Sequence, residues 1–289
     1  MHPNDLLRTL AAVVAPTSAE VGAAKRHFET IKTRLDQSFE AKRFIPIGSH
    51  ARGTAIQYHS DIDMLAVLPR KVALRGDRRI APKTFLKNVA EDLQDRYTTT
   101  RIRTDGQAVV LYFAGGTHSV DLVPGVFEGM NGNRPVYLIP GTADAWIPTS
   151  PETHDLIFQN ADTRSGGKLG HVARLIKAWK FGRQAPLPLS SFYTDMLLAT
   201  TDIAAGVKTY AQCLRDSFAI IAERDARGLR DPGGVAGVIS ACSNQGRRDA
   251  LVTAARYARD HSDYAIDAER SRKNDEAARQ WGIVFNRDL

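Results

Sequence analysis

Two short segments in the first third of the chain carry residues suited to phosphate and metal chemistry. Gly48 and Ser49 form a turn-like pair, and Asp61 and Asp63 open an apolar, strand-like stretch that continues to Leu68. Side chains alternate along a strand, so the two aspartates should project to the same side, about 7 Å apart. Carboxylate oxygens bind Mg²⁺ in proteins, usually together with substrate phosphates. The spacing therefore predicts a site where metal ions hold a phosphorylated substrate.

A two-metal site needs a further acid, and Asp121 is the candidate. It lies in 119–124, a run rich in β-branched apolar residues that favours a buried strand. One ion would neutralise a leaving pyrophosphate, and the other would lower the pKa of an attacking hydroxyl whose proton Asp121 receives. We expect two Mg²⁺ ions, with Mn²⁺ as a substitute. Gly48 would let the backbone approach the phosphates, a helix opening just after it would offer unpaired amides, and Ser49 would add its hydroxyl.

The composition is that of an ordinary globular chain. Its 289 residues are 43% hydrophobic, which is enough for one large or two modest domains. The formal charge of +7 indicates an anionic partner, and nucleoside triphosphates satisfy that as well as nucleic acid does. The two cysteines, Cys213 and Cys242, form no close pair, which disfavours a disulfide framework and fits a cytoplasmic setting. No leader pattern or long apolar run occurs, so we expect no membrane association.

The elements that must position these residues form an α+β lobe with a mixed sheet. Apolar residues at helical spacing predict helices over 5–14 and 18–39, the second with Ser18 as its N-cap. Short apolar runs predict strands, and one further helix interrupts them. The strands are expected at 43–47, 64–68, 101–104, 109–113 and 119–123, and the interrupting helix at 82–97.

Beyond a Pro- and Gly-rich connection at 140–151 the pattern becomes helical. We therefore predict N-terminal helices over 1–40, a catalytic lobe over 41–148 and a helical lobe over 149–289. A cleft between lobes is a common place for a ligand site, and we expect the active site there. The helices of the last lobe are expected to begin near residues 152, 168, 190, 209, 247 and 267.

Gly48-Ser49, Asp61-x-Asp63 and Asp121, in this order, resemble the motif of the nucleotidyltransferase superfamily that includes DNA polymerase β. Within that superfamily the helical half resembles the CD-NTase family of cyclic-oligonucleotide synthases, relatives of cyclic GMP-AMP synthase and oligoadenylate synthase. Together the two resemblances span most of the chain. The helical segments that carry the second resemblance are 169–179, 189–193 and 274–285.

The resemblance implies a polymerase β-like lobe and a specific activity. NTPs would be joined through 2′-5′ or 3′-5′ bonds into a cyclic di- or oligonucleotide second messenger, with release of pyrophosphate. The product would act in antiviral defence of the CBASS type by switching on a separate effector protein. A regulatory nucleic acid or protein is a further expected partner, and the basic clusters at 70–71, 75–79 and 270–273 are either its groove or simply solvated faces.

The resemblance also implies roles for residues of the helical half. Lys177, on a helix facing the cleft, would grip the donor triphosphate, and Ser191 would hydrogen-bond its terminal phosphates. Phe192 would stack on a base, with Tyr193 as the alternative. Structural roles stay open for all three: a helix-surface lysine, an N-cap serine and a core aromatic.

Two other functions remain possible from the sequence. The same acids could transfer a nucleotide to an RNA 3′ end, a small molecule such as an aminoglycoside, or a protein. A non-catalytic nucleic-acid-binding module is the other alternative, although the intact acids argue against it. The histidines show no zinc-ligand spacing; His50 is expected in the phosphate turn, and His118 is expected to face solvent.

Overall fold

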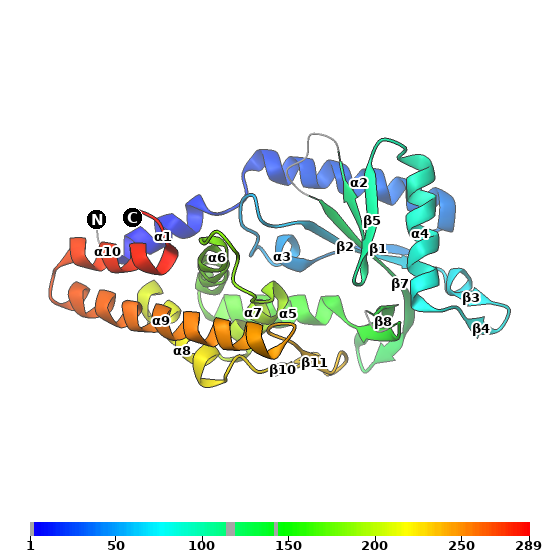
Figure 1. Ribbon diagram of the computed structural model, residues 1–289. Helices are drawn as coiled ribbons and strands as arrows, with labels where there is room; N and C mark the ends of the chain where they lie inside the picture. The colour runs from blue at the N-terminus through cyan, green and yellow to red at the C-terminus, as the bar shows by residue number, and fades with distance from the viewer. Residues whose placement is uncertain (1–2, 114–118, 142–143) are drawn as a thin grey trace.

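The computed structural model describes residues 3–113, 119–141 and 144–289; His118 lies outside them. A mixed sheet with helices packed on it forms one part of the molecule, and helices form the other (Figure 1). The predicted α+β class is therefore confirmed. Within the described residues, none of the helices combines the length and the apolar composition that crossing a membrane requires.

The sheet is built around two parallel neighbours, β2 (Ile62–Leu68) and β7 (Val120–Asn131). Strands β1, β2, β7, β6 and β5 follow one another in space, and β8 and β9 extend the sheet from β7 through antiparallel pairs. Because β2 is central and almost wholly apolar, nearly all its side chains are buried. The other strands are β1 (Arg43–Ile47), β5 (Arg101–Asp105), β6 (Ala108–Tyr112), β8 (Arg134–Pro140) and β9 (Trp146–Thr149).

The sequence pattern misses β8 and β9. Strand β9 lies within the stretch that its Pro and Gly content predicts to be a loop, so that prediction is wrong. Pro148 is tolerated because β9 pairs only with β8 in the sheet, and a missing N–H there breaks no central ladder. Two small hairpins are also present: β3 (Leu74–Arg75) with β4 (Arg78–Arg79), and β10 (Leu229–Arg230) with β11 (Val238–Ile239).

The helices follow the expected pattern with local differences. Thr17, not Ser18, caps the long second helix: its hydroxyl accepts from the Glu20 N–H, and the Glu20 carboxylate accepts from the Thr17 N–H. No helix begins at Asp267, which lies in the last turn of α9. The helices are α1 (Pro3–Val13), α2 (Ser18–Phe39), α3 (Gly48–Ala51), α4 (Pro82–Arg96), α5 (Pro151–Arg164), α6 (Lys168–Phe181), α7 (Ser191–Thr200), α8 (Tyr210–Glu223), α9 (Gln245–Arg270) and α10 (Asn274–Phe285), with a 3₁₀ turn, η1, at Arg70–Ala73.

The two N-terminal helices pack in different hydrophobic cores. Leu7 and Leu10 of α1 pack in the core of the helical lobe, whereas Ile31 and Leu35 of α2 pack against the sheet. Helix α1 also contacts α10, and the two ends of the chain lie near each other in Figure 1. The first forty residues thus contribute one helix to each lobe rather than forming a unit of their own.

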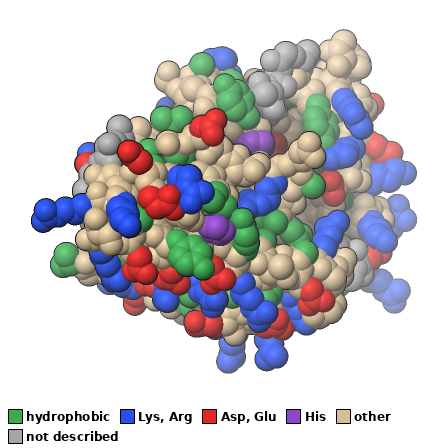
Figure 2. All heavy atoms as spheres, turned by 60° about the vertical axis from the view of Figure 1, so that its left-hand side comes forward, with side chains coloured by type: hydrophobic (Ala, Val, Ile, Leu, Met, Phe, Trp, Pro, Cys, Tyr) green, Lys and Arg blue, Asp and Glu red, His purple; other side chains and the backbone are tan. Residues whose placement is uncertain are grey.

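Charged side chains of both signs are interspersed over the helical end of the molecule (Figure 2). The net charge of +7 is therefore not gathered into a single basic face on this side. A phosphate backbone binds best to a continuous basic stripe. The regulatory nucleic-acid groove stays a prediction.

Candidate active site

Asp61, Asp63 and Asp121 line one cavity of about 580 Å³. Asp63 and Asp121 are register partners on the parallel strands β2 and β7, so their side chains project to the same face of the sheet. Asp61 immediately precedes β2. The structure thus brings the three acids of the sequence motif together at one end of the two central strands.

Gly48 packs directly against one of these carboxylates. Its φ is +72°, and a Cβ at this position would lie 1.9 Å from Asp63 Oδ2, so only glycine fits without moving the acid. Gly48 and Ser49 both line the cavity. The helix expected just after the glycine is the four-residue α3, which begins at Gly48 itself. One turn offers backbone amides but only a small helix dipole.

The three carboxylates differ in their pKa values and in their hydrogen bonds. Burial, followed by the charges of Asp121 and Asp61, raises the pKa of Asp63 to about 7. Burial and the Asp61 charge raise the pKa of Asp121 to about 6, and Asp121 Oδ1 is buried without a hydrogen-bond partner among the described residues. Asp61 Oδ1, by contrast, accepts from the Ser119 hydroxyl at 2.6 Å and from the Ser119 N–H at 3.3 Å. The cavity floor therefore holds mutually repelling carboxylates.

Such a donor set fits a hard divalent cation. Among the described residues, no group of three or more His, Cys, Asp or Glu side chains is arranged so that it could hold a metal ion. The unpaired oxygen of Asp121 and the repulsion that raises the pKa of Asp63 are both relieved by a bound cation. The acids present therefore suit the magnesium ions that the sequence predicts.

In metal-free buffer the protein should lose stability as the pH rises from about 4 to about 7. The folded pKa of Asp63 lies above its ordinary 3.8, so the native state binds more protons than the unfolded chain in this window. The free energy of unfolding then falls with pH, by up to roughly 4 kcal/mol. Asp63→Asn should remove the part of the fall that Asp63 contributes, and the raised pKa of Asp121, about 6, should leave a smaller fall in the variant. Urea unfolding in EDTA across the pH range measures it, with the exposed Asp95→Asn as control. An unchanged slope in Asp63→Asn would contradict the assignment.

The prediction that Lys177 faces the cleft is wrong. The residue is 2% exposed and does not line the cavity. Its Nζ donates to Thr54 Oγ1 at 2.6 Å and lies 2.9 Å from Asp195 Oδ1. Asp195, itself wholly buried on α7, draws the ammonium inward because a buried cation needs a buried anion. A grip of Lys177 on a triphosphate stays a prediction, and it requires Nζ to leave Asp195.

Arg52 is a site residue that the sequence pattern does not reveal. Its guanidinium donates to Asp195 from Nε and to Asp155 from an Nη, both at 3.0 Å, and lies 5.5 Å from the centre of the Phe192 ring. It also lines the cavity. Through Arg52 the turn that begins at Gly48 is tied to α5 and α7 of the helical lobe. A single arginine after the motif carries no signal of these partners.

Ser191 and Phe192 reach the cavity, whereas Tyr193 does not. Tyr193 is fully buried and its hydroxyl donates to the Arg227 carbonyl, which removes it as the stacking alternative. Ser191 is the first residue of α7, and the side chain of Ser190 caps the helix. The structural alternative of an N-cap role for Ser191 is therefore wrong.

Lys180 is a second residue that the sequence pattern misses. It lies almost one helical turn beyond Lys177 on α6, and its Nζ donates to Ser191 Oγ at 3.4 Å. Burial and the charge of Lys177 lower the pKa of Lys180 to about 8. Of the two lysines, Lys180 is the one whose ammonium adjoins a residue of the cavity wall.

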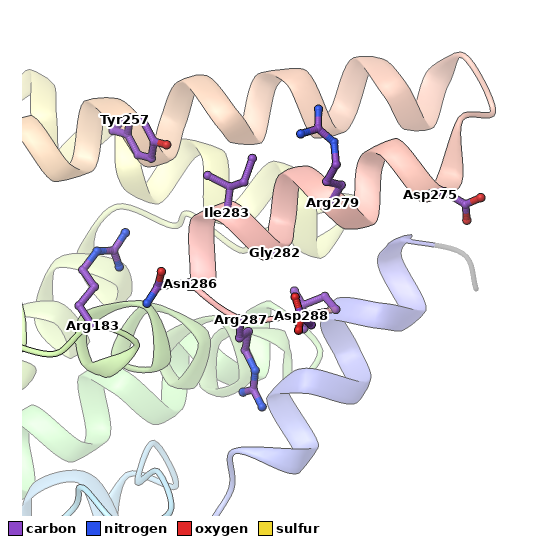
Figure 3. Close-up of a pocket in the computed structure, with 10 residues that line it drawn as sticks. Arg183, Tyr257, Asp275, Arg279, Gly282, Ile283, Asn286, Arg287 and Asp288 are labelled. Carbon is purple, nitrogen blue, oxygen red and sulfur yellow. The ribbon is translucent and has the colours of Figure 1, made fainter.

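A larger concavity of about 870 Å³ lies at the far end of the helical lobe, along α9 and α10. In Figure 3 the side chains of Arg279 and Arg287 point in opposite directions, and Arg279 forms an ion pair with Glu276. Arg183, which also lines this concavity, donates to the backbone carbonyls of Trp179 and Val284, so these three arginines do not face a common point. We assign the chemistry to the smaller cavity, which Asp61, Asp63 and Asp121 all line.

Comparison with known proteins shows which family and which solved structures this chain is similar to. A curated relative, the cyclic AMP-AMP-AMP synthase of Escherichia coli (strain MS 115-1), is 26% identical over 194 residues, which cover 65% of this chain and 59% of the relative. The structure of the E. coli MS115-1 CdnC:HORMA-deltaN complex matches with a TM-score of 0.72 at 20% identity, over 98% of this chain and 96% of that one. The Bradyrhizobium diazoefficiens CD-NTase CdnG in complex with GTP matches with a TM-score of 0.73 at 13% identity, over 99% of both chains.

These structures confirm the polymerase β-like fold and the resemblance to CD-NTases. The family description "Second Messenger Oligonucleotide or Dinucleotide Synthetase domain" matches residues 1–161, which include the turn and all three acids. Because this match spans more than half of the chain, the protein belongs to the Second Messenger Oligonucleotide or Dinucleotide Synthetase (SMODS) family.

Proposed function

We propose that the protein is a nucleotidyltransferase that joins NTPs into a cyclic di- or oligonucleotide and releases pyrophosphate. The observation that carries the proposal is the convergence of Asp61, Asp63 and Asp121 in one cavity with the Gly48 turn. Membership of the SMODS family and the name of the E. coli relative support a cyclic product. The GTP complex of CdnG supports NTPs as substrates.

Each transfer forms a bond between an α-phosphorus and a ribose hydroxyl oxygen and breaks the bond to pyrophosphate. Gly48 and Ser49 would bind the phosphate tail through backbone amides and a hydroxyl. Asp61, Asp63 and Asp121 would hold the two Mg²⁺ ions, which when bound neutralise phosphate charge and favour ionisation of the hydroxyl. Asp121 would receive the hydroxyl proton, the role that the sequence motif predicts for it.

The aromatic wall of the cavity would contact a base. Phe192 presents its ring to the cavity beside Arg52, and an aromatic face accepts any nucleobase at roughly 1–3 kcal/mol. Ser191, next to it, would hydrogen-bond phosphate oxygens. Phe192 and Ser191 would therefore bind the nucleotide, and the three acids of the same cavity would support the chemistry.

The activity is tested by incubating the protein with Mg²⁺ and radiolabelled ATP, GTP, CTP and UTP, followed by phosphatase. We expect a small labelled product that the phosphatase does not degrade and that is absent with Asp61→Asn or Asp121→Asn. Label transferred instead to added RNA, to a small-molecule acceptor or to protein would favour the other nucleotidyltransferase function. Salt-dependent RNA binding without any NTP turnover would favour the non-catalytic module.

We also propose that the product acts as a signal, in antiviral defence of the CBASS type, by activating a separate effector protein. Membership of a family named for second-messenger synthesis supports this. A regulatory protein partner is supported by the complex of CdnC with HORMA-deltaN.

Lys180→Met should raise the KM for NTP about ten-fold at pH 7, because it removes an ammonium beside the phosphate-binding Ser191. Because its pKa is lowered to about 8, Lys180 loses its positive charge as the pH rises through that value. The wild-type KM for NTP should therefore rise above about pH 8. The variant should lack this rise. Lys87→Met, on the exposed face of α4, is the matched control. Equal KM profiles for the variant and the wild type would exclude Lys180 from phosphate binding.

A further inference from the structure

His154 occupies an unusual position for a titratable side chain. It lies in the first turn of α5, just after the chain leaves the sheet, and it is only 3% exposed. Even so, it lines the cavity that contains the three acids and Phe192. The role proposed above for the acids, the turn and Ser191 makes no use of this imidazole.

Asp231 fixes the imidazole ring of His154. His154 Nε2 lies 2.7 Å from Asp231 Oδ1, and the carboxylate also accepts the backbone N–H groups of Gly233, Val235 and Ala236. Burial raises the pKa of Asp231, but these backbone bonds outweigh it and the net pKa is lowered. The carboxylate therefore stays an acceptor, and Nε2 carries a proton. In the neutral ring this leaves Nδ1 as a hydrogen-bond acceptor.

The backbone around Asp231 leaves the ring little freedom. A Cβ on Gly233 would lie 3.0 Å from His154 Nε2, so the loop packs directly on the imidazole. Arg134 of β8 donates to the Gly233 carbonyl at 3.3 Å, which attaches the same loop to the sheet. Asp231 holds the ring through Nε2, so its contact leaves the other ring nitrogen, Nδ1, unused. A rigid ring with one unused acceptor is thus built into the cavity wall.

The ring stands beside the aromatic surface expected to contact a base. The His154 and Phe192 ring centres are 5.1 Å apart with their planes at 77°, and Arg52 lies over Phe192. A nucleobase bound against this wall would meet the imidazole with one of its polar edges. An acceptor nitrogen pairs with an amino group and is left unpaired opposite a carbonyl oxygen.

We propose, on the basis of the function proposed above, that His154 determines base specificity by accepting a hydrogen bond from an exocyclic amino group, as on adenine or cytosine. Asp231 is the positioning residue that sets the tautomer. The substrate class at this position is then an amino-bearing NTP rather than its carbonyl-bearing counterpart. A purely structural brace between α5 and the 231–237 loop would affect all NTPs alike.

The test uses two substrate pairs that exchange an amino group for a carbonyl: ATP against ITP, and CTP against UTP. Each pair competes at equal concentration, and mass spectrometry measures the ratio of the two bases incorporated. This ratio does not depend on the amount of folded enzyme. For whichever pair is used, the wild type should favour the amino base about ten-fold or more. His154→Phe should bring the ratio near one, and His154→Asn, whose Oδ1 replaces Nδ1 as acceptor, should keep most of the preference.

Asp231→Asn provides an independent readout. Two amides, Val235 and Ala236, donate to Asp231 Oδ2, whereas the Gly233 amide alone donates to Oδ1. The asparagine oxygen would therefore take the Oδ2 position, and its NH₂ group, which forgoes the Gly233 bond, would face His154 and donate to Nε2. The ring proton would move to Nδ1, and the preference should shift toward the carbonyl base. A wild-type ratio that favours carbonyl bases, or one that His154→Phe leaves unchanged, overturns the inference. Product from GTP alone would also overturn the inference, whereas the absence of any product from ATP, GTP, CTP and UTP would mean that the proposed function itself fails and the specificity inference with it.

Discussion

Asp63→Asn should reduce NTP turnover about a thousand-fold or more while the protein stays folded. Asp63 is the most constrained of the three acids: it is the register partner of Asp121, and Gly48 packs on its carboxylate. Asparagine keeps the shape of the side chain but removes the negative charge that a divalent cation needs. The same substitution relieves the repulsion that raises the Asp63 pKa to about 7. Loss of activity should therefore coincide with a gain of stability at pH 8 in EDTA.

Initial rates of pyrophosphate release at saturating Mg²⁺, together with urea unfolding in EDTA, measure both effects on one preparation. Asp95→Asn, which changes the same group on the exposed side of α4, should leave both quantities within about two-fold or 0.5 kcal/mol of wild type. An active Asp63→Asn protein would remove the acid from the mechanism. An inactive but destabilised one would instead indicate damage to the fold.

Asp195→Asn should have the largest effect on stability, about 3–5 kcal/mol. Asp195 is fully buried and pairs with two cations, Arg52 from the turn and Lys177 from α6. Removing its charge leaves Lys177 without an anion in contact and weakens the hold of the helical lobe on the turn. Burial already lowers the pKa of Lys177, and Asp195 is the main group opposing that shift.

Equilibrium unfolding in urea at pH 7 measures the loss. Lys177→Met should cost less than Asp195→Asn, because Asp195 would keep Arg52 and the Thr54 hydroxyl as partners. Asp263→Asn, which breaks a partly exposed pair with Arg215, should cost at most about 1 kcal/mol. Equal losses for Asp195→Asn and Asp263→Asn would show that the buried pairs do not join the lobes energetically.

The three acids of the cavity are predictable from sequence because their geometry is local. Asp61 and Asp63 are two residues apart at the start of a strand, and alternation alone places them on one side. Asp121 lies in a second apolar strand, and an acid at the start of a buried run favours a position beside the first pair. Family membership, shown by the match to residues 1–161, agrees with the motif that these acids form with Gly48.

The helical wall is less predictable because its side chains are placed by distant partners. The orientation of Lys177 depends on Asp195 and Thr54, which lie on other elements, and helical periodicity carries no information about either. Arg52 is likewise held by carboxylates more than 100 residues away in sequence. Strand β9 is missed because proline normally interrupts strands and is accepted here only at a sheet edge.

The arrangement of metal ions beneath a bound triphosphate is the central claim of this account. Anomalous diffraction from crystals grown with Mn²⁺ and a non-hydrolysable NTP analogue tests it most directly. Two Mn²⁺ peaks are expected among Asp61, Asp63, Asp121 and the phosphates, with the phosphate tail on Gly48 and Ser49. A triphosphate bound elsewhere, such as in the concavity along α9 and α10, or a cavity in which Asp121 contacts no Mn²⁺, would contradict it.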